Sequence, residues 1–169
     1  QIDLATNSTL IDENLAKKIK SIGFHRVAIS LDSARQEIND SLRQEGAFLK
    51  SIAAIRHLRL QGIDLQLNTT VLRRNFREIA SIYNLCLELG IKAWHLFAFV
   101  PVGCGETLPE EERLTQEDYE EFFSEVVGLF LESKIEIRMT CAPHYNRLLA
   151  QRLGNATSLV SKGCLAGSS

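Results

Sequence analysis

Apolar and polar positions along the chain follow a repeated layout of an amphipathic segment, a glycine and a short apolar run. In the amphipathic segments the apolar residues recur three or four positions apart, which is typical of a helix that buries one face. The apolar runs are typical of strands that are covered on both faces. The three units comprise residues 15–22, Gly23 and 27–32; residues 48–60, Gly62 and 65–71; and residues 76–89, Gly90 and 93–100.

The expected helix ends are marked by glycine, and one further unit begins at a cap. Gly62 and Gly90 stand where a left-handed residue closes a helix at low steric cost. Thr115 and Asp118 have the spacing of a capping box in which Asp replaces the usual Glu or Gln. This box predicts a helix from Thr115 to about Leu131, and a short strand is expected over residues 135–139.

Strands that alternate with helices indicate an α/β fold with parallel strands joined by right-handed crossovers. The pattern alone is compatible with an open doubly wound sheet or with part of a barrel. No GxGxxG or GxxxxGK[ST] sequence follows any of the expected strands. An ordinary dinucleotide-binding domain or a P-loop enzyme is therefore disfavoured.

Composition narrows the class further. The 169 residues are 45% hydrophobic and 24% charged, as in a single globular domain with a substantial core. A net charge of −2 offers no general attraction for nucleic acid or an anionic membrane, and no apolar run approaches the roughly 20 residues of a membrane span. A domain of this size does not need disulfides. We therefore expect a reducing, cytoplasmic location, with neither nucleic acid nor membrane as a partner.

Small polar side chains stand at the ends of the first expected strands, where parallel α/β folds bind their ligands. For a single residue, a turn or a helix cap is the simpler explanation. Three strand ends of the same kind favour a site for a ligand with hydroxyl and amide groups, such as a nucleoside. The residues at these ends are Thr6, Asn7, Ser30, Asp32, Asn68 and Thr70.

Five segments occur in a characteristic order: ATNSTLI, VAISLDS, INDSLRQEGAF, NTTVLRRN and WHLFAFVPVG. Together they resemble radical S-adenosylmethionine (SAM) enzymes that carry a C-terminal SPASM or twitch extension. This branch includes enzymes of haem and pyrroloquinoline quinone synthesis and peptide maturases. The closing CAPHYNR and GCLAG look most like the haem-synthesis members. The resemblance implies the later half of a (β/α)6 partial TIM barrel in residues 1–140, and the truncated start of a cysteine-bearing auxiliary-cluster extension in 141–169.

The resemblance also implies a SAM pocket at the strand ends. Ser30 and Asp32 would contact the ribose or methionine part of SAM, and Arg43 or Arg73 could pair with its carboxylate through a guanidinium fork. Ser8 stands where the family usually has glycine. The residues that the resemblance places in the pocket are Thr6, Asn7, Ser30, Asp32, Arg43, Asn68, Thr70, Arg73 and Val102.

In this family three thiolates of a CxxxCxxC loop hold a [4Fe-4S] cluster, which cleaves SAM reductively to a 5′-deoxyadenosyl radical. That spacing does not occur in this sequence, so we expect the chain alone to be inactive. By the same resemblance Cys141 and Cys164 are expected to be ligands of an auxiliary cluster that this chain leaves incomplete. The implied partners are a small-molecule or peptide substrate and an electron donor such as flavodoxin or ferredoxin. Cys86 lies on an apolar helix face and is expected to be an inert core thiol.

Two other readings of the same residues remain open. Cys141 and His144 have a spacing that zinc ligands use, and Cys104 or Cys164 could join them. An α/β-barrel enzyme that depends on zinc, or on no metal, is thus one alternative. A non-catalytic module that binds a nucleoside is the other.

Overall fold

The computed structural model describes residues 2–100 and 106–153, and in them five parallel strands form one sheet. The strands lie side by side in the order in which they follow one another in sequence. Right-handed crossovers between successive neighbours place every helix on the same face, as in a barrel wall, whereas a doubly wound sheet reverses its order. The strands are β1 (Asp3–Thr6), β2 (Arg26–Ser30), β3 (Asp64–Val71), β4 (Ala93–Ala98) and β5 (Glu136–Thr140).

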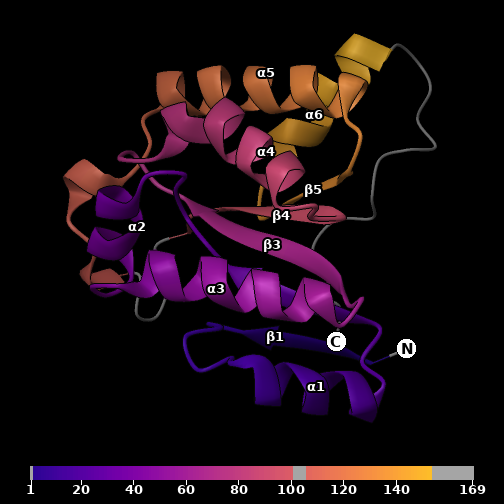
Figure 1. Cartoon of the computed structure of the whole chain (residues 1–169). Coiled ribbons are helices and arrows are strands. Elements are labelled where there is room, and N and C mark those ends of the chain that lie inside the picture. Colours follow the sequence, from indigo (N-terminus) through magenta and orange to yellow (C-terminus); the bar gives the residue numbers. More distant parts are fainter. Residues whose placement is uncertain (1, 101–105, 154–169) are drawn as a thin grey trace, which may run out of the picture.

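The helices surround the outside of this sheet, with α1 and α3 along one part and α4, α5 and α6 along the other (Figure 1). No helix in the described part of the chain is both long and apolar enough to cross a membrane. The helical elements are α1 (Glu13–Ile22), α2 (Gln36–Leu42), α3 (Ala47–Leu60), the 3-10 turn η1 (Phe76–Glu78), α4 (Ile79–Glu88), the 3-10 turn η3 (Glu110–Glu112), α5 (Gln116–Glu132) and α6 (Pro143–Leu153).

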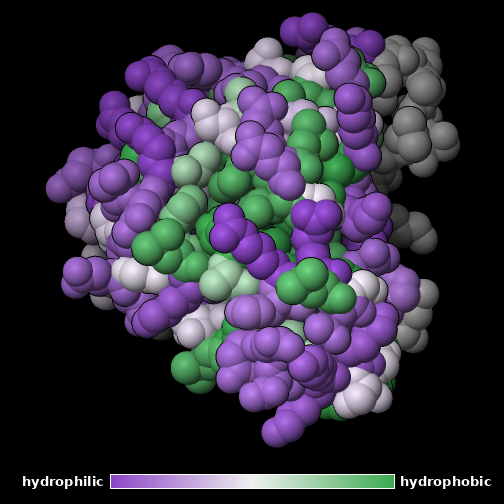
Figure 2. Space-filling model, viewed as in Figure 1, coloured by the Kyte–Doolittle hydropathy of each residue, from purple (hydrophilic) through white to green (hydrophobic). Residues whose placement is uncertain are grey.

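The hydrophobic core lies between the sheet and the helices. Alternate residues of each strand face the helices, so that Leu65 and Leu67 of β3 are fully buried beside Ile29 of β2. Trp94 of β4 is also fully buried, and its Nε1–H donates to Oγ1 of Thr69 at 2.9 Å. Figure 2 shows apolar side chains in the middle of the helical face, over α3 and α4, where half-buried apolar residues of both helices adjoin the core.

The other face of the sheet is concave and polar. Arg26 of β2 and Glu136 of β5 form an ion pair there, with 3.2 Å between Nη1 and Oε2. Strands β3 and β4 lie between them, and in a flat sheet the two backbones would be about 14 Å apart. The sheet is therefore strongly curved. Ala28 and Ala93 lie on the same face and leave room for the two long side chains.

The local signals of the sequence are largely confirmed. Gly62 and Gly90 end their helices with φ of +66° and +63°. Thr115 and Asp118 form both hydrogen bonds of the capping box. The ends of the long helices and of the strands differ from the expected ends by no more than a few residues.

Two helices were not expected. Residues 36–42 form α2, and residues 143–153, in the segment expected to begin a cysteine-bearing extension, form α6. Helix α6 packs against α5 and buries Tyr145 and Leu149 in the core. The reason is spacing, because these two apolar residues stand four positions apart on a single helical face.

Replacing Thr115 by alanine in the intact protein is expected to lower the free energy of unfolding by about 1 kcal/mol, because the first turn of α5 loses its cap. Denaturant unfolding of the variant and of the unchanged protein measures this difference.

The carboxyl group of Asp118 should make stability depend on pH. Hydrogen bonds from Thr115, together with the charge of the nearby Arg73, hold the pKa of Asp118 below its usual value despite its burial. The stabilising effect of the ionised Asp118 carboxylate is complete at a pH above its usual pKa and is lost as the pH falls through the lowered pKa. Denaturant unfolding of Asp118→Asn at several pH values checks this. An Asp118→Asn variant that was still less stable than the unchanged protein at pH 2 would contradict this expectation.

Candidate functional site

Asp32 lies at the centre of the strand ends and is nearly fully buried. Its Oδ1 accepts a hydrogen bond from the backbone N–H of Thr70 at 2.8 Å, which joins the end of β2 to the end of β3. Its Oδ2 lies 2.8 Å from Nε of Arg43. Both carboxylate oxygens are thus engaged within the protein, and Asp32 positions its neighbours.

Arg43, at the C-terminal end of α2, brings a guanidinium group to the same edge of the sheet. Its side chain is 25% exposed, and its buried Nε has no well-aligned hydrogen bond although it pairs with Asp32 by charge. The remaining N–H groups of the fork leave it able to bind a carboxylate or a phosphate in a bidentate manner.

Asn75 holds the two loops that follow β2 and β3. Its side chain is 1% exposed, and its Nδ2 donates to the carbonyl oxygens of Asp32 at 2.7 Å and Thr70 at 2.8 Å. Its Oδ1 accepts from the backbone N–H of Leu72 at 2.7 Å. One amide therefore satisfies three backbone groups at the strand ends.

A buried carboxylate makes a second connection between the same loops. Glu78, in η1, accepts hydrogen bonds from the hydroxyl of Ser33 and from Nε of Arg35. Asn39 of α2 holds Asp32 from within the segment that follows β2, because its Oδ1 accepts from the backbone N–H of Asp32 at 3.0 Å. The loop that carries Asp32 is thus held on several sides.

The other predicted residues of β2 and β3 lie on the concave face. Ser30 is paired in register with Asn68, and Thr70 lies one layer nearer the strand ends. All three are half-buried. The hydroxyl of Ser30 makes no hydrogen bond within the described residues. The structure therefore brings together Ser30, Asp32, Arg43, Asn68 and Thr70.

Thr6 and Asn7 lie at the end of β1, beside this group but with local hydrogen bonds. Thr6 is in register with Ile29, so its side chain is on the helix-covered side, where Oγ1 accepts from the backbone N–H of Ser8 at 3.0 Å. Ser8 has φ of +63°, a conformation that favours glycine. Its hydroxyl is hydrogen-bonded to Ser51 at 3.0 Å, which gives a serine a reason to stand there.

Arg73 does not join the group. Its side chain is directed to α5, where Nε lies 3.7 Å from Oδ2 of Asp118. Val102 and Cys164 lie outside the described residues.

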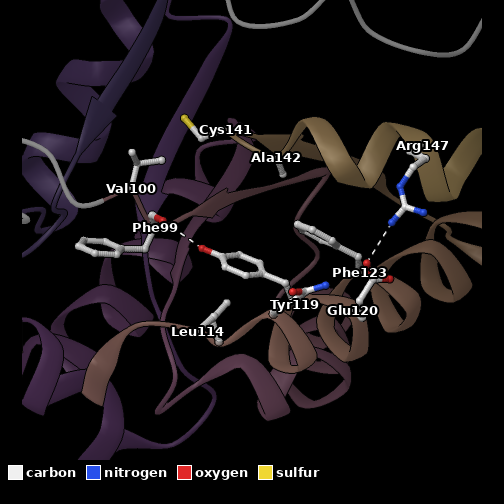
Figure 3. A pocket seen from close by; sticks show the side chains of 10 residues that line it. Phe99, Val100, Leu114, Tyr119, Glu120, Phe123, Cys141, Ala142 and Arg147 are labelled. Carbon is white, nitrogen blue, oxygen red and sulfur yellow. Dashed lines mark hydrogen bonds and ion pairs between the residues drawn. The ribbon is translucent and has the colours of Figure 1, made fainter. Parts of the chain in front are cut away.

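A cavity of about 830 Å³ adjoins the ends of β4 and β5. Figure 3 shows Phe99, Leu114, Tyr119 and Phe123 around it, and the Tyr119 hydroxyl donates to the carbonyl oxygen of Phe99 at 3.2 Å. Its polar groups include an ion pair between Arg147 and Glu120 at 3.0 Å. An apolar, partly aromatic lining suits an apolar group of a ligand or of another segment.

Cys141 lies at the rim of this cavity, in the turn between β5 and α6 (Figure 3). It is exposed and has φ of +61°, an uncommon conformation for a residue other than glycine. Cys86 is the opposite case, because it is fully buried and burial raises the pKa of its thiol far above the usual range. Cys86 is an inert core thiol.

No group of three potential metal-ligating side chains converges in the part of the chain that the structure describes. Cys104, Cys164 and the side chain of His144, which the zinc interpretation requires, lie outside that part.

Two residues of the site, Asn75 and Glu78, had no signal in the sequence. Both follow β3 in a stretch that reads as the start of a helix. Gln66 and His95 lie on the same face of the sheet as Asn68, and this had a signal, because a polar residue that alternates with apolar ones in a strand faces the side away from the helices.

The family profile described as the Radical SAM superfamily matches residues 1–86. The AdoMet-dependent heme synthase of Methanosarcina barkeri is 35% identical over 178 residues, covering 99% of this chain and 50% of that protein. The Fe-coproporphyrin III synthase of the same organism is 33% identical over 76% of this chain and 31% of its own length. The chain thus spans half or less of the length of these relatives.

The fold also matches solved structures. SuiB of Streptococcus suis superposes with a TM-score of 0.70 over 91% of this chain and 36% of SuiB, at 13% sequence identity. A second SuiB structure, bound to S-adenosylmethionine, gives a TM-score of 0.64 over 82% of this chain and 32% of SuiB. At this identity the likeness establishes the fold, a partial α/β barrel.

Proposed function

The chain belongs to the radical SAM superfamily, and on that premise we propose that its strand ends form one side of a SAM pocket in a longer enzyme. The observation that supports this most is Arg43, whose guanidinium lies at the ends of β2 and β3 beside half-buried polar side chains. A methionine carboxylate suits the fork of Arg43, and ribose hydroxyls suit Ser30, Asn68 and Thr70. Thr6, Asn7 and Val102 remain proposed contacts.

The structure favours Arg43 over Arg73 as the partner of the methionine carboxylate, because Arg73 is directed toward α5. Asp32 orients the Arg43 guanidinium and fixes the Thr70 backbone, while Asn75 and Glu78 hold the loops. These residues orient SAM. A [4Fe-4S] cluster, bound by thiolates that this chain does not supply, would provide the electron that cleaves SAM to a 5′-deoxyadenosyl radical.

For the substrate we propose a tetrapyrrole. The names of the two Methanosarcina relatives, a heme synthase and an Fe-coproporphyrin III synthase, support this class. The apolar cavity beside β4 and β5 is compatible with a large planar group. An electron donor such as flavodoxin or ferredoxin and a reducing, cytoplasmic location complete the proposal.

Residues from 141 onward are proposed to begin an auxiliary-cluster extension. An exposed position in the turn after β5 is compatible with Cys141 as a ligand. Cys164 is proposed as its companion, and two thiolates alone do not complete a cluster site.

The deciding experiment uses the full-length protein, reconstituted anaerobically with iron and sulfide and then supplied with dithionite and SAM. Mass spectrometry is expected to detect 5′-deoxyadenosine, and the product should disappear when cysteines upstream of this chain are replaced. A folded protein that binds no cluster and forms no 5′-deoxyadenosine would overturn the proposal.

Arg43→Met in the full-length protein is expected to weaken SAM binding by roughly 10- to 100-fold, since a hydrogen-bonded charge pair with the ligand is lost. Arg73→Met is the matched control and should leave SAM affinity unchanged. Equilibrium titration of both variants measures the difference. Equal losses for the two arginines would show that the assignment of Arg43 is wrong.

A further inference from the structure

A layer of four polar side chains crosses the concave face of the sheet. Ser30 on β2, Asn68 on β3, His95 on β4 and Arg138 on β5 are register partners of one another. They therefore point to the same side, away from the helices. We name these residues the donor layer. Below it, toward the start of the strands, the Arg26–Glu136 ion pair crosses the concave face.

Gln66, one layer below on β3, sets the direction of the hydrogen bonds. Its Nε2 donates to Oδ1 of Asn68 at 2.7 Å and lies 3.0 Å from Nδ1 of His95. Because this nitrogen of Gln66 is a donor, Nδ1 of His95 accepts and the imidazole proton is on Nε2. The groups that remain on Asn68 and His95 are consequently the amide NH2 and the Nε2–H.

The Nε2 atom of His95 is buried and has no hydrogen-bond partner within the described residues. Burial lowers the pKa of His95, and the nearby Arg138 lowers it further, so the ring is neutral at physiological pH. A buried N–H without an acceptor is costly, and native proteins seldom keep one without a use.

The charges around the layer favour an anion. Arg26 and Arg138 bring two guanidinium groups against the single carboxylate of Glu136, to which Nε of Arg138 lies at 2.6 Å. Burial raises the pKa of Glu136, but the two arginines outweigh that effect and keep it ionised. Arg26, Arg138 and Glu136 therefore have a net positive charge, which lies beside the donor layer.

We propose that the donor layer is a subsite for one carboxylate group of the substrate. The proposal rests on the proposed function, which gives a tetrapyrrole as the substrate and assigns the methionine carboxylate of SAM to Arg43. The recognising groups are the Nε2–H of His95 and the charge of Arg138.

The test compares His95→Leu, His95→Gln and the unchanged full-length protein. His95→Leu removes the donor, whereas the amide of His95→Gln can still donate. His25→Leu is the matched control, because His25 lies outside the layer and is 44% exposed. Iron coproporphyrin III is titrated against its methyl ester, which has no free carboxylate. SAM, whose carboxylate is assigned to Arg43, is titrated as the reference ligand.

His95→Leu is expected to weaken binding of the free acid by about 10-fold, with binding of the ester and of SAM unaffected. His95→Gln should recover most of the loss, and His25→Leu should behave as the unchanged protein. If His95→Leu fails to fold, Arg138→Gln at the 65% exposed end of the layer makes the same comparison.

Equal losses for the acid and its ester, or no loss for the acid, would overturn the subsite. Failure of the proposed function is recognised separately, by the absence of 5′-deoxyadenosine from the unchanged protein. The comparison of coproporphyrin with its ester still decides the subsite in that case.

Discussion

Replacing Asp32 by alanine is expected to lower the free energy of unfolding of the intact protein by about 2–4 kcal/mol and to abolish measurable SAM binding. Asp32 is buried, and its loss removes the acceptor of the Thr70 N–H and leaves the Arg43 guanidinium without its counter-charge. Denaturant unfolding and SAM titration on one preparation measure both effects.

Ser30→Ala is the matched control for Asp32→Ala. Ser30 ends the same strand and its hydroxyl makes no hydrogen bond to the described residues, so removal of the hydroxyl should weaken SAM binding without a change in stability beyond about 0.5 kcal/mol. Asp32→Ala with full stability and weakened binding would instead make Asp32 a direct ligand contact.

Replacing Asn75 by alanine is expected to destabilise the intact protein by about 3–5 kcal/mol, because three buried backbone groups lose their partner at once. The loops after β2 and β3 should also separate, which hydrogen exchange at the Leu72 amide would record as faster exchange. Asn75→Asp is the informative comparison. It retains an acceptor for the N–H of Leu72 but has no donor for the carbonyls of Asp32 and Thr70. Asn75→Asp should therefore be clearly less stable than the unchanged protein, although it keeps one of the three hydrogen bonds.

A result within about 1 kcal/mol of the unchanged protein for Asn75→Ala would show that water replaces the amide, and the connection between the two loops would then have to be assigned to Glu78.

The order of helices and strands could be predicted because it depends on short-range patterns. The φ of Gly90 and the box at Thr115 are determined by residues within one turn. Curvature could not be predicted in this way, because it is seen in an ion pair between residues 110 positions apart. The choice between an open sheet and a barrel wall depended on strand order, for which hydrophobic periodicity has no signal.

At the site, sequence reasoning placed Ser30, Asp32 and Asn68 at the strand ends, which follows from strand length alone. It had no means to distinguish Arg43 from Arg73, since the two arginines differ only in which neighbour they meet. The unexpected α2 is the reason, because it ends at Arg43 and so delivers that side chain to Asp32. Whether these residues bind SAM stays a prediction.

The ion pair between Arg26 and Glu136 can form only late in synthesis. Its two residues belong to the second and the last strand of the described sheet, so the pair forms only after the segment from β2 to β5 has left the ribosome. Until then the cation of Arg26 has no Glu136 beside it. Contacts of such long separation close late and slow the search for the native state. A nascent chain arrested before β5 should therefore remain a flatter, more protease-sensitive sheet.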